Sequence, residues 1–262
     1  MRDEGKSLMI LKFAAAIVSI LTVVACETVQ QTGRSQFLMV SESQEQQLGE
    51  DAYQETLKKH PLSSRGEWQA QIRRVGQRIT AAADKPEYKW EFNVLQGKEV
   101  NAFALPGGKV AFWEGIMPIA ADDGGVAVIM GHEIAHALAR HGAERMSQQM
   151  GAQAVGQILA LGVGQMSPGF QDDFLTLYGL GANVGLLMPW GRAQESEADR
   201  IGLTLMARAG YDPAAAVAFW ERMAKVAGDK PPEFLSTHPS DATRIDQIKQ
   251  WLPEARSHYR AR

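Results

Sequence analysis

Residues 131–142 of this 262-residue chain read GHEIAHALARHG, so one short segment holds three of its six histidines. In a helix, His132 and His136 lie four residues apart and project from one face, with their side chains about 5–6 Å apart. Two imidazoles in that arrangement can bind a single metal ion, and Glu133 can reach a water molecule on the ion from the neighbouring face. The spacing is the H-E-x-x-H pattern, which predicts two zinc ligands and a carboxylate general base for hydrolysis.

The residues that surround this pair are apolar. Two unpaired histidines among them would be buried polar groups without partners, which is energetically unfavourable. Metal coordination therefore explains the two histidines better than packing in a hydrophobic core does. The apolar neighbours are Val126, Ile129, Met130, Ile134, Ala135 and Leu138.

A catalytic zinc ion needs a third protein ligand and one open coordination position. His141 comes five residues after His136 and points away from the shared face of a continuous helix. The acidic segment QESEADRIG, residues 194–202, is the other source. There Glu195 and Asp199 share one helix face, so one can bind the metal while the second accepts the outer N–H of a ligating histidine. Taken alone, this segment would be interpreted as a solvated helix face.

The elements that must position these side chains are mainly helices. Trp90, Phe92 and Val94 alternate with polar residues, which predicts a strand, and two further strand-like runs flank the Pro-Gly-Gly turn at 106–108. The sequence therefore predicts a helix-rich α+β chain with a small β-sheet before the histidine-bearing helix. Apolar spacing and capping residues predict helices over about 43–60, 65–83, 122–140, 143–165, 192–209, 213 onward and 240–252, with Ser43 and Gln46 as a capping box and Gly142 ending the third.

Three separated segments also resemble a known family. GHEIAHALARHG, RAQESEADRIG and STHPSDATRI occur in the same order as in the gluzincin metallopeptidases. That family contains HtpX, the CAAX prenyl proteases and the Oma-type proteases, and the compact BepA/LoiP-like periplasmic lipoproteins look most similar. The resemblance covers roughly residues 40–252. It implies a zincin-like metalloprotease domain, with a small β-sheet beside the active-site helix and one Zn²⁺ per chain.

The resemblance also implies roles for individual residues. Glu195 matches the first residue of the family's E-x-x-A-D pattern and would be the third zinc ligand, whereas Glu197 would not. His238 precedes a proline in a loop that lies near the zinc in the family. We expect it either to stabilise the oxyanion or to occupy the open metal position in a resting state. Arg244 is expected to pair with an acidic side chain or to orient substrate.

A further implied feature is an edge strand for substrate. The segment NAFALPGG, which starts at residue 101, resembles the family's strand beside the active-site helix. An exposed strand edge can bind an extended peptide through its main chain, with loose sequence selectivity. An ordinary hairpin strand is the alternative. The residues concerned are Asn101, Ala102, Phe103 and Ala104, continuing to Leu105.

The N-terminal segment predicts export and a lipid anchor. The run FAAAIVSILTVVA, residues 13–25, suits a signal peptide and is too short for a bilayer-spanning helix, which needs about 20 residues. It ends at Cys26, where Val-Val-Ala-Cys resembles the cleavage box of bacterial lipoproteins. An uncleaved anchor or an ordinary buried thiol is the alternative. Two or more acyl chains on Cys26 would hold the protein stably on a membrane, and Glu27 indicates the outer membrane by resemblance to sorting rules.

These observations predict the organisation of the chain. We expect a lipoprotein signal peptide over 1–25, a lipid-anchored tether over 26–40, the peptidase domain over 41–252 and a C-terminal tail over 253–262. The folded part would face the periplasm. A formal net charge of −3 gives no support for a nucleic-acid partner, and the single cysteine excludes an intrachain disulfide.

The sequence therefore predicts a zinc-dependent endopeptidase. The resemblance implies that its substrates are unfolded or misassembled cell-envelope proteins. One alternative is a metal-holding but proteolytically inactive chaperone-like lipoprotein, and another is a structural lipoprotein whose histidines are accidental. Glu133 favours the enzyme, because a protein that only binds its clients has little need of a general base. The sequence does not predict the oligomeric state.

Overall fold

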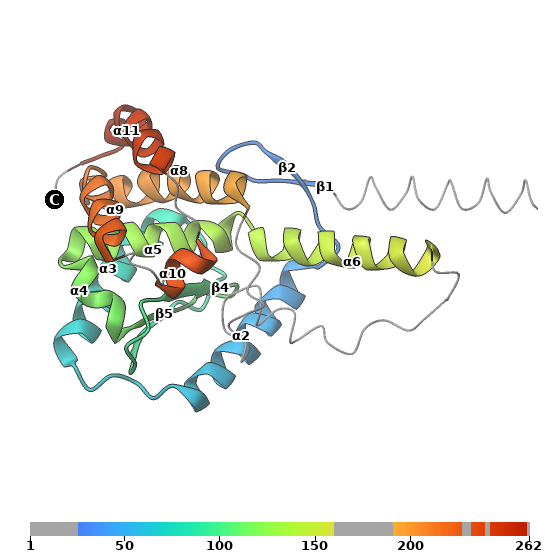
Figure 1. Ribbon diagram of the computed structural model, residues 1–262, viewed down its shortest axis with the longest axis horizontal. Helices are drawn as coiled ribbons and strands as arrows, with labels where there is room; N and C mark the ends of the chain where they lie inside the picture. Colours follow the sequence, from blue (N-terminus) through green and yellow to red (C-terminus); the bar gives the residue numbers. More distant parts are fainter. Residues whose placement is uncertain (1–25, 160–190, 227–231, 239–241, 261–262) are drawn as a thin grey trace, which may run out of the picture.

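The computed structural model describes residues 26–159, 191–226, 232–238 and 242–260. The predicted signal peptide, residues 1–25, lies outside the described residues. Helices surround a small β-sheet, so the helix-rich α+β class is confirmed (Figure 1). None of the helices in the described ranges combines the length and the apolar content that crossing a bilayer requires.

Most helices form layers over one face of the sheet, whereas α2 packs against β4 and β5 from the other face. In Figure 1, α11, α8 and α5 follow one another from the top of the view towards the sheet, and α5 packs directly against both α8 and strand β4. Helix α3 packs beside α5 and against β3. The helices are α2 (Glu42–Lys59), α3 (Gly66–Ala83), α4 (Met117–Ala120), α5 (Asp123–Leu138), α6 (His141–Leu159), α8 (Arg192–Arg208), α9 (Ala215–Val226), α10 (Glu233–Thr237) and α11 (Ala242–Ser257), with a 3₁₀ turn η1 (Glu114–Ile116).

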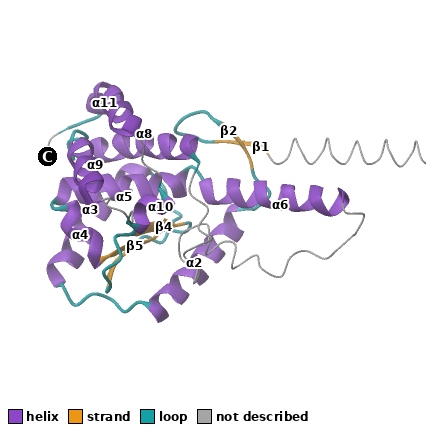
Figure 2. Cartoon of the chain, viewed as in Figure 1, coloured by secondary structure: helices purple, strands orange, loops and turns teal. Residues whose placement is uncertain are grey.

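The main sheet has three strands in the order β3-β5-β4. Figure 2 shows its strands in orange among the helices. Strand β3 (Glu91–Leu95) pairs with β5 (Lys109–Trp113) in parallel, whereas β4 (Ala102–Leu105) pairs with β5 antiparallel. The predicted turn joins β4 to β5, and its Gly107 and Gly108 have φ of 86° and 97°, a region that favours glycine. Two short strands near the start of the chain, β1 (Cys26–Thr28) and β2 (Ser35–Phe37), form a separate antiparallel hairpin.

Helix α5 is the centre of the fold. Asp122 caps its N-terminus by accepting a hydrogen bond from the amide of Gly125 at 2.8 Å. Every residue of α5 from Gly125 to Leu138 is buried. This buried stretch is apolar on all sides except for the H-E-x-x-H residues, as expected for a helix covered on every face. The two histidines and the glutamate therefore lie in the interior of the protein.

Three predicted helix boundaries are wrong. The capping box of α2 consists of Ser41 and Gln44 and not of Ser43 and Gln46, because the first pair makes both reciprocal hydrogen bonds. Gly142 does not end α5. The chain turns at Arg140, whose φ is 54°, and α6 begins at the next residue. The last helix is also longer than predicted and continues to Ser257.

Candidate metal centre

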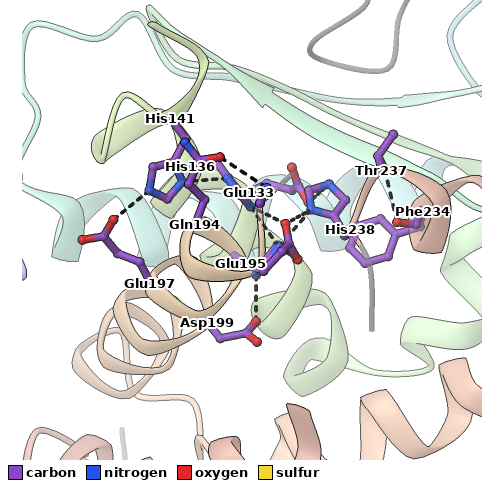
Figure 3. Close-up of polar contacts among 12 residues, drawn as sticks. Glu133, His136, His141, Gln194, Glu195, Glu197, Asp199, Phe234, Thr237 and His238 are labelled. Atoms are coloured by element: carbon purple, nitrogen blue, oxygen red, sulfur yellow. Dashed lines mark hydrogen bonds and ion pairs between the residues drawn. The ribbon is translucent and has the colours of Figure 1, made fainter. Parts of the chain in front are cut away.

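Four side chains from three parts of the chain meet beside α5. His132 and His136 come from α5, Glu195 from the first turn of α8, and His238 from the residue that follows α10. Each offers one ligand atom, and these atoms all lie within 4.8 Å of one another. Figure 3 shows His136, Glu195 and His238 pointing into the same small space, with Glu133 next to them. All four residues of the cluster are buried.

The distances within the cluster suit one tetrahedral ion. With metal–ligand distances of about 2.0–2.1 Å, two ligand atoms of a tetrahedral zinc lie about 3.4 Å apart. The Nε2 atoms of His132 and His136 lie 3.2 Å apart. Glu195 is 3.3 Å from His136 Nε2 through Oε1 and 3.5 Å from His132 Nε2 through Oε2. Nδ1 of His238 completes the set, 3.1 Å from His132 Nε2 and 2.9 Å from Glu195 Oε1.

The chemistry of these donors also fits zinc, which takes imidazole nitrogens and carboxylate oxygens. Nδ1 of His132 faces Asp199, so its Nε2 is an acceptor when the ring is neutral, and it lies 3.2 Å from Nε2 of His136. A cation between these two nitrogens would satisfy both. Oε2 of Glu195 and Oε1 of Glu133 are buried, and among the described residues no donor makes a hydrogen bond to either oxygen. Oε2 of Glu195 lies 3.0 Å from Arg244 Nη1, but this is an ion-pair distance without hydrogen-bond geometry.

Glu133 lies beside the cluster without being part of it. Its Oε1 is 3.4 Å from Nε2 of His238. Complete burial raises the pKa of the Glu133 carboxyl above its ordinary value of 4.5, although the neighbouring histidines oppose the shift. The pKa of His238 is also raised, because the charges of Glu133 and Glu195 outweigh the opposing effect of burial. A carboxyl group with a raised pKa is suited to take up and release a proton near neutral pH.

The outer nitrogen of His132 contacts the acid that the sequence pointed to. Nδ1 of His132 is 2.8 Å from Oδ1 of Asp199. Arg244 donates to both oxygens of Asp199, at 2.7 and 2.8 Å, and its guanidinium carbon lies 3.6 Å from the centre of the Trp220 ring. Burial would raise the pKa of Asp199, but the Arg244 charge holds it below its ordinary value. Of the two roles expected for Arg244, the structure shows the acidic pairing.

The pKa of Glu195 is lowered in the same way as that of Asp199. Burial opposes ionisation, yet the charges of His238 and Arg244 hold its pKa well below the ordinary 4.5. Burial has the opposite effect on His136, whose pKa it lowers well below 6.5. An ionised carboxylate and a neutral imidazole are the forms in which these groups bind metal.

The outer nitrogen of His136 has a partner that sequence reasoning missed. Nδ1 of His141 lies 2.9 Å from Nδ1 of His136, and Nε2 of His141 lies 2.9 Å from Oε2 of Glu197 (Figure 3). A continuous helix would have turned His141 away. The break at Arg140, between α5 and α6, instead brings the His141 ring back to His136. The sequence contains no signal of this turn, because an arginine rarely takes a left-handed φ. Burial lowers the pKa of His141.

Glu197 is not in the cluster, as the resemblance implied. Burial would raise its pKa, but hydrogen bonds from His141, Thr32 and Arg34 lower it to about 2. Arg34, which lies between β1 and β2, donates through Nε to Oε2 of Glu197 at 2.7 Å and through Nη1 to Oε1 of Glu144 at 2.6 Å. The residues just before Ser35 are therefore joined to α6 and α8.

The remaining predicted residues are not members of the ligand cluster. Strand β4 is at the edge of the sheet and packs against α5, and its residues are buried. Asn101 is also buried, and its side-chain oxygen accepts a hydrogen bond from the amide of Ala102 at 2.9 Å. Cys26 is exposed at the start of β1, opposite Phe37.

Comparison with known proteins gives the family. Peptidase family M48 matches residues 67–252. The mitochondrial metalloendopeptidase OMA1 of Schizosaccharomyces pombe is 39% identical over 234 residues, which is 87% of this chain and 67% of that protein. OMA1 of Saccharomyces cerevisiae is 36% identical over 254 residues, 86% of this chain and 69% of that protein.

The beta-barrel assembly-enhancing protease of Escherichia coli is 29% identical over 226 residues, which is 84% of this chain and 46% of that protein. The identities are thus higher for the two fungal proteins than for this bacterial one, whereas we expected the compact BepA/LoiP-like lipoproteins to be the most similar. The match to the family spans both the H-E-x-x-H helix and Glu195. The chain therefore belongs to Peptidase family M48 and is a zinc metalloendopeptidase with one buried metal site.

Proposed function

We propose that this metalloendopeptidase cleaves unfolded or misassembled proteins of the bacterial cell envelope. The E. coli relative is a protease whose name refers to the assembly of β-barrels, and this supports an envelope substrate. The observation that carries the peptidase mechanism is the position of Glu133, a buried carboxyl group placed beside three imidazoles and Glu195.

In the proposed mechanism His132, His136 and Glu195 hold the zinc ion. When bound, zinc acts as a Lewis acid towards the peptide carbonyl and lowers the pKa of water. Glu133 accepts the proton from the attacking water and returns it to the leaving amine. Asp199 keeps the ring of His132 in place, because it accepts a hydrogen bond from the outer N–H and Arg244 in turn fixes its carboxylate.

His238 closes the site in the conformation described here. Its Nδ1 lies as close to Glu195 and to His132 as a fourth ligand would. Because a catalytic zinc site needs one position for water or substrate, we propose that His238 moves away before cleavage. The alternative role, stabilisation of the oxyanion, requires the same side chain to contact substrate instead of the ligands.

Strand β4 is the proposed place for the extended substrate. It is the edge strand of the sheet and packs on α5, the helix that bears both zinc histidines. A peptide paired with Asn101–Ala104 would be recognised mainly through its backbone, which suits a protease that acts on many unfolded sequences. All residues of β4 are buried, so binding of substrate requires the segment that covers this strand to move.

We also propose that acyl chains on Cys26 hold the protein on the outer membrane, facing the periplasm. The thiol is exposed and directly precedes Glu27 in β1. Replacing Cys26 by serine should release the protein from the membrane fraction into the periplasmic fraction of a bacterial host. A Cys26→Ser variant that stays with the membrane would contradict the lipid anchor but not the peptidase activity.

The peptidase function itself is tested with purified protein and unfolded casein. Cleavage should stop when a chelator removes zinc and should return when zinc is added back. Folded serum proteins should be cleaved far more slowly. A protein that holds one zinc ion yet cuts no unfolded substrate would instead support the chaperone-like alternative.

A further inference from the structure

The two zinc histidines are supported differently at their outer nitrogens. For His132 a carboxylate contacts the ring directly: Asp199 accepts a hydrogen bond from Nδ1, and Arg244 binds Asp199. For His136 the group at Nδ1 is another imidazole, that of His141 at 2.9 Å. On the other side of the His141 ring lie a second carboxylate, Glu197, and a second arginine, Arg34. The chain of hydrogen bonds that starts at His136 is therefore longer by one residue.

The order of hydrogen bonds along this second path follows from the chemistry of imidazole. His136 points Nε2 at the metal cluster, so its proton is on Nδ1 when it binds metal. His141 must then accept that proton's hydrogen bond at its own Nδ1, and a neutral His141 carries its proton on Nε2. That nitrogen lies 2.9 Å from Oε2 of Glu197, which can accept but not donate when ionised. The path therefore has one consistent direction, from His136 to Glu197.

Arg34 ends this path. Its Nε lies 2.7 Å from the same Oε2 of Glu197, and its Nη atoms bind both oxygens of Glu144 at 2.6 and 2.9 Å. Glu197 and Glu144 keep only 7% and 9% of their side-chain surface exposed, so their charges need a nearby cation. Arg34 supplies that cation from outside α6 and α8. In Figure 1 the β1–β2 hairpin runs beside the start of α8 and the start of α6.

We propose that Arg34 is a positioning residue for zinc: through Glu197 and His141 it fixes the tautomer and ring orientation of His136. The inference rests on the proposed role of His136 as a zinc ligand. Arg34 lies before residue 67, where the match to the peptidase family begins. The hairpin that starts at Cys26 is thereby part of the support of the metal site and not only a connection to the anchor.

The test is the affinity of the full-length protein for zinc, measured by competition with a chromogenic chelator. Replacement of the partner of a metal-binding histidine usually weakens metal binding by about 10–100-fold. We expect a loss in that range for His141→Phe, which keeps a ring but removes both nitrogens. Arg34→Gln, which acts two residues further from the metal, should weaken binding by about 3–10-fold on the same grounds. Arg34→Lys should restore part of the loss.

Two control variants separate the path from general damage. Arg200→Gln removes another arginine–glutamate pair of α8, the exposed contact with Glu254, and should leave zinc affinity unchanged. Glu144→Gln removes the other carboxylate that Arg34 binds but leaves Glu197 and His141 in contact. It should also bind zinc nearly as well as the wild type. The melting temperature of each metal-free variant shows whether the protein is folded.

A second measurement reports on the site itself. Cobalt(II) in place of zinc gives a visible absorption spectrum that depends on ligand geometry, and it should change in Arg34→Gln and His141→Phe but not in Arg200→Gln. Zinc affinities within twofold of wild type for both Arg34→Gln and His141→Phe would overturn the inference while leaving the zinc site intact. An equal loss in Glu144→Gln would also overturn it, because docking of the hairpin would then be the cause. A wild-type protein without zinc would overturn the proposed function as well.

Discussion

Gly131 of α5 and Gly202 of α8 face each other where the two helices cross. A Cβ atom built on Gly131 would lie 2.9 Å from the carbonyl oxygen of Gly202, and one built on Gly202 would lie 2.9 Å from the carbonyl carbon of Gly131. Both neighbours are backbone atoms, which cannot move aside as a side chain can. The two glycines therefore set how closely α8 approaches α5, and this distance decides whether Glu195 reaches the histidines.

Gly202→Ala should consequently destabilise the protein and weaken its zinc binding. In an ordinary helix this change is favourable by about 1 kcal/mol, but here we expect overpacking to lower the free energy of unfolding by about 1–3 kcal/mol. Gly66→Ala is the control, because nothing lies within 4 Å of the added Cβ. Denaturant unfolding and zinc competition measure both effects. Equal behaviour of the two variants would show that the close crossing is unimportant.

Glu133→Gln separates zinc binding from catalysis. Glutamine keeps the size of the side chain but cannot accept a proton, so cleavage of casein should fall by about 100-fold or more. Zinc content should remain at wild-type level, since Glu133 lies outside the ligand cluster. Full activity in this variant would refute the proposed general base, and loss of zinc would show that Glu133 has a coordination role.

His238→Ala distinguishes the two roles considered for this residue. If His238 acts as the fourth ligand of a resting site, its removal opens that position and casein cleavage should rise several-fold. His258→Ala, a change just after α11, serves as the control. A strong fall in kcat for His238→Ala, with zinc content unchanged, would instead show that the imidazole helps in the reaction.

Much of the centre could be predicted from local sequence. The spacing of His132 and His136 needs only the helical repeat, and the strand and turn before α5 follow from alternation and two glycines. The E-x-x-A-D pattern predicts Glu195 as a ligand, although this residue is 59 positions from His136 and the sequence does not show their contact. Each of these features depends on residues that are close together in the sequence, and it can therefore be predicted without knowledge of the fold.

The rest depends on contacts between distant segments. Arg140 takes a left-handed φ, and its guanidinium donates to Glu45 at 2.5 Å and to the carbonyl of Val40 at 2.8 Å. Residues 138–142 alone do not predict these distant partners, so the sequence favoured Gly142 as the end of the helix. We expected residues 26–40 to be a tether, but they contain two strands, and Arg34 holds these strands through two glutamates that are more than 100 residues away.

The pair between Glu45 and Arg140 predicts a pH dependence of stability. Glu45 is 1% exposed, and burial raises its pKa to about 7 although the Arg140 charge opposes the shift. One carboxylate oxygen contacts Arg140, but among the described residues the other has no hydrogen-bond donor, which agrees with this direction. Between pH 4.5, the ordinary pKa, and about 7, the folded protein holds this proton while the unfolded chain releases it. The contribution of Glu45 to the free energy of unfolding therefore falls as pH rises through this range.

Glu45→Gln removes that proton uptake, so its stability relative to wild type should improve from pH 4.5 to 7, by roughly 2 kcal/mol since each pKa unit corresponds to about 1.4 kcal/mol. Glu50→Gln, on the same helix, is the control. A hydrogen bond from Gln54 lowers the pKa of Glu50 below 4.5, so its effect falls outside the measured range. Urea unfolding at several pH values gives the comparison. A difference between wild type and Glu45→Gln that stays constant with pH would mean that Glu45 is ionised throughout, with Arg140 compensating fully for its burial.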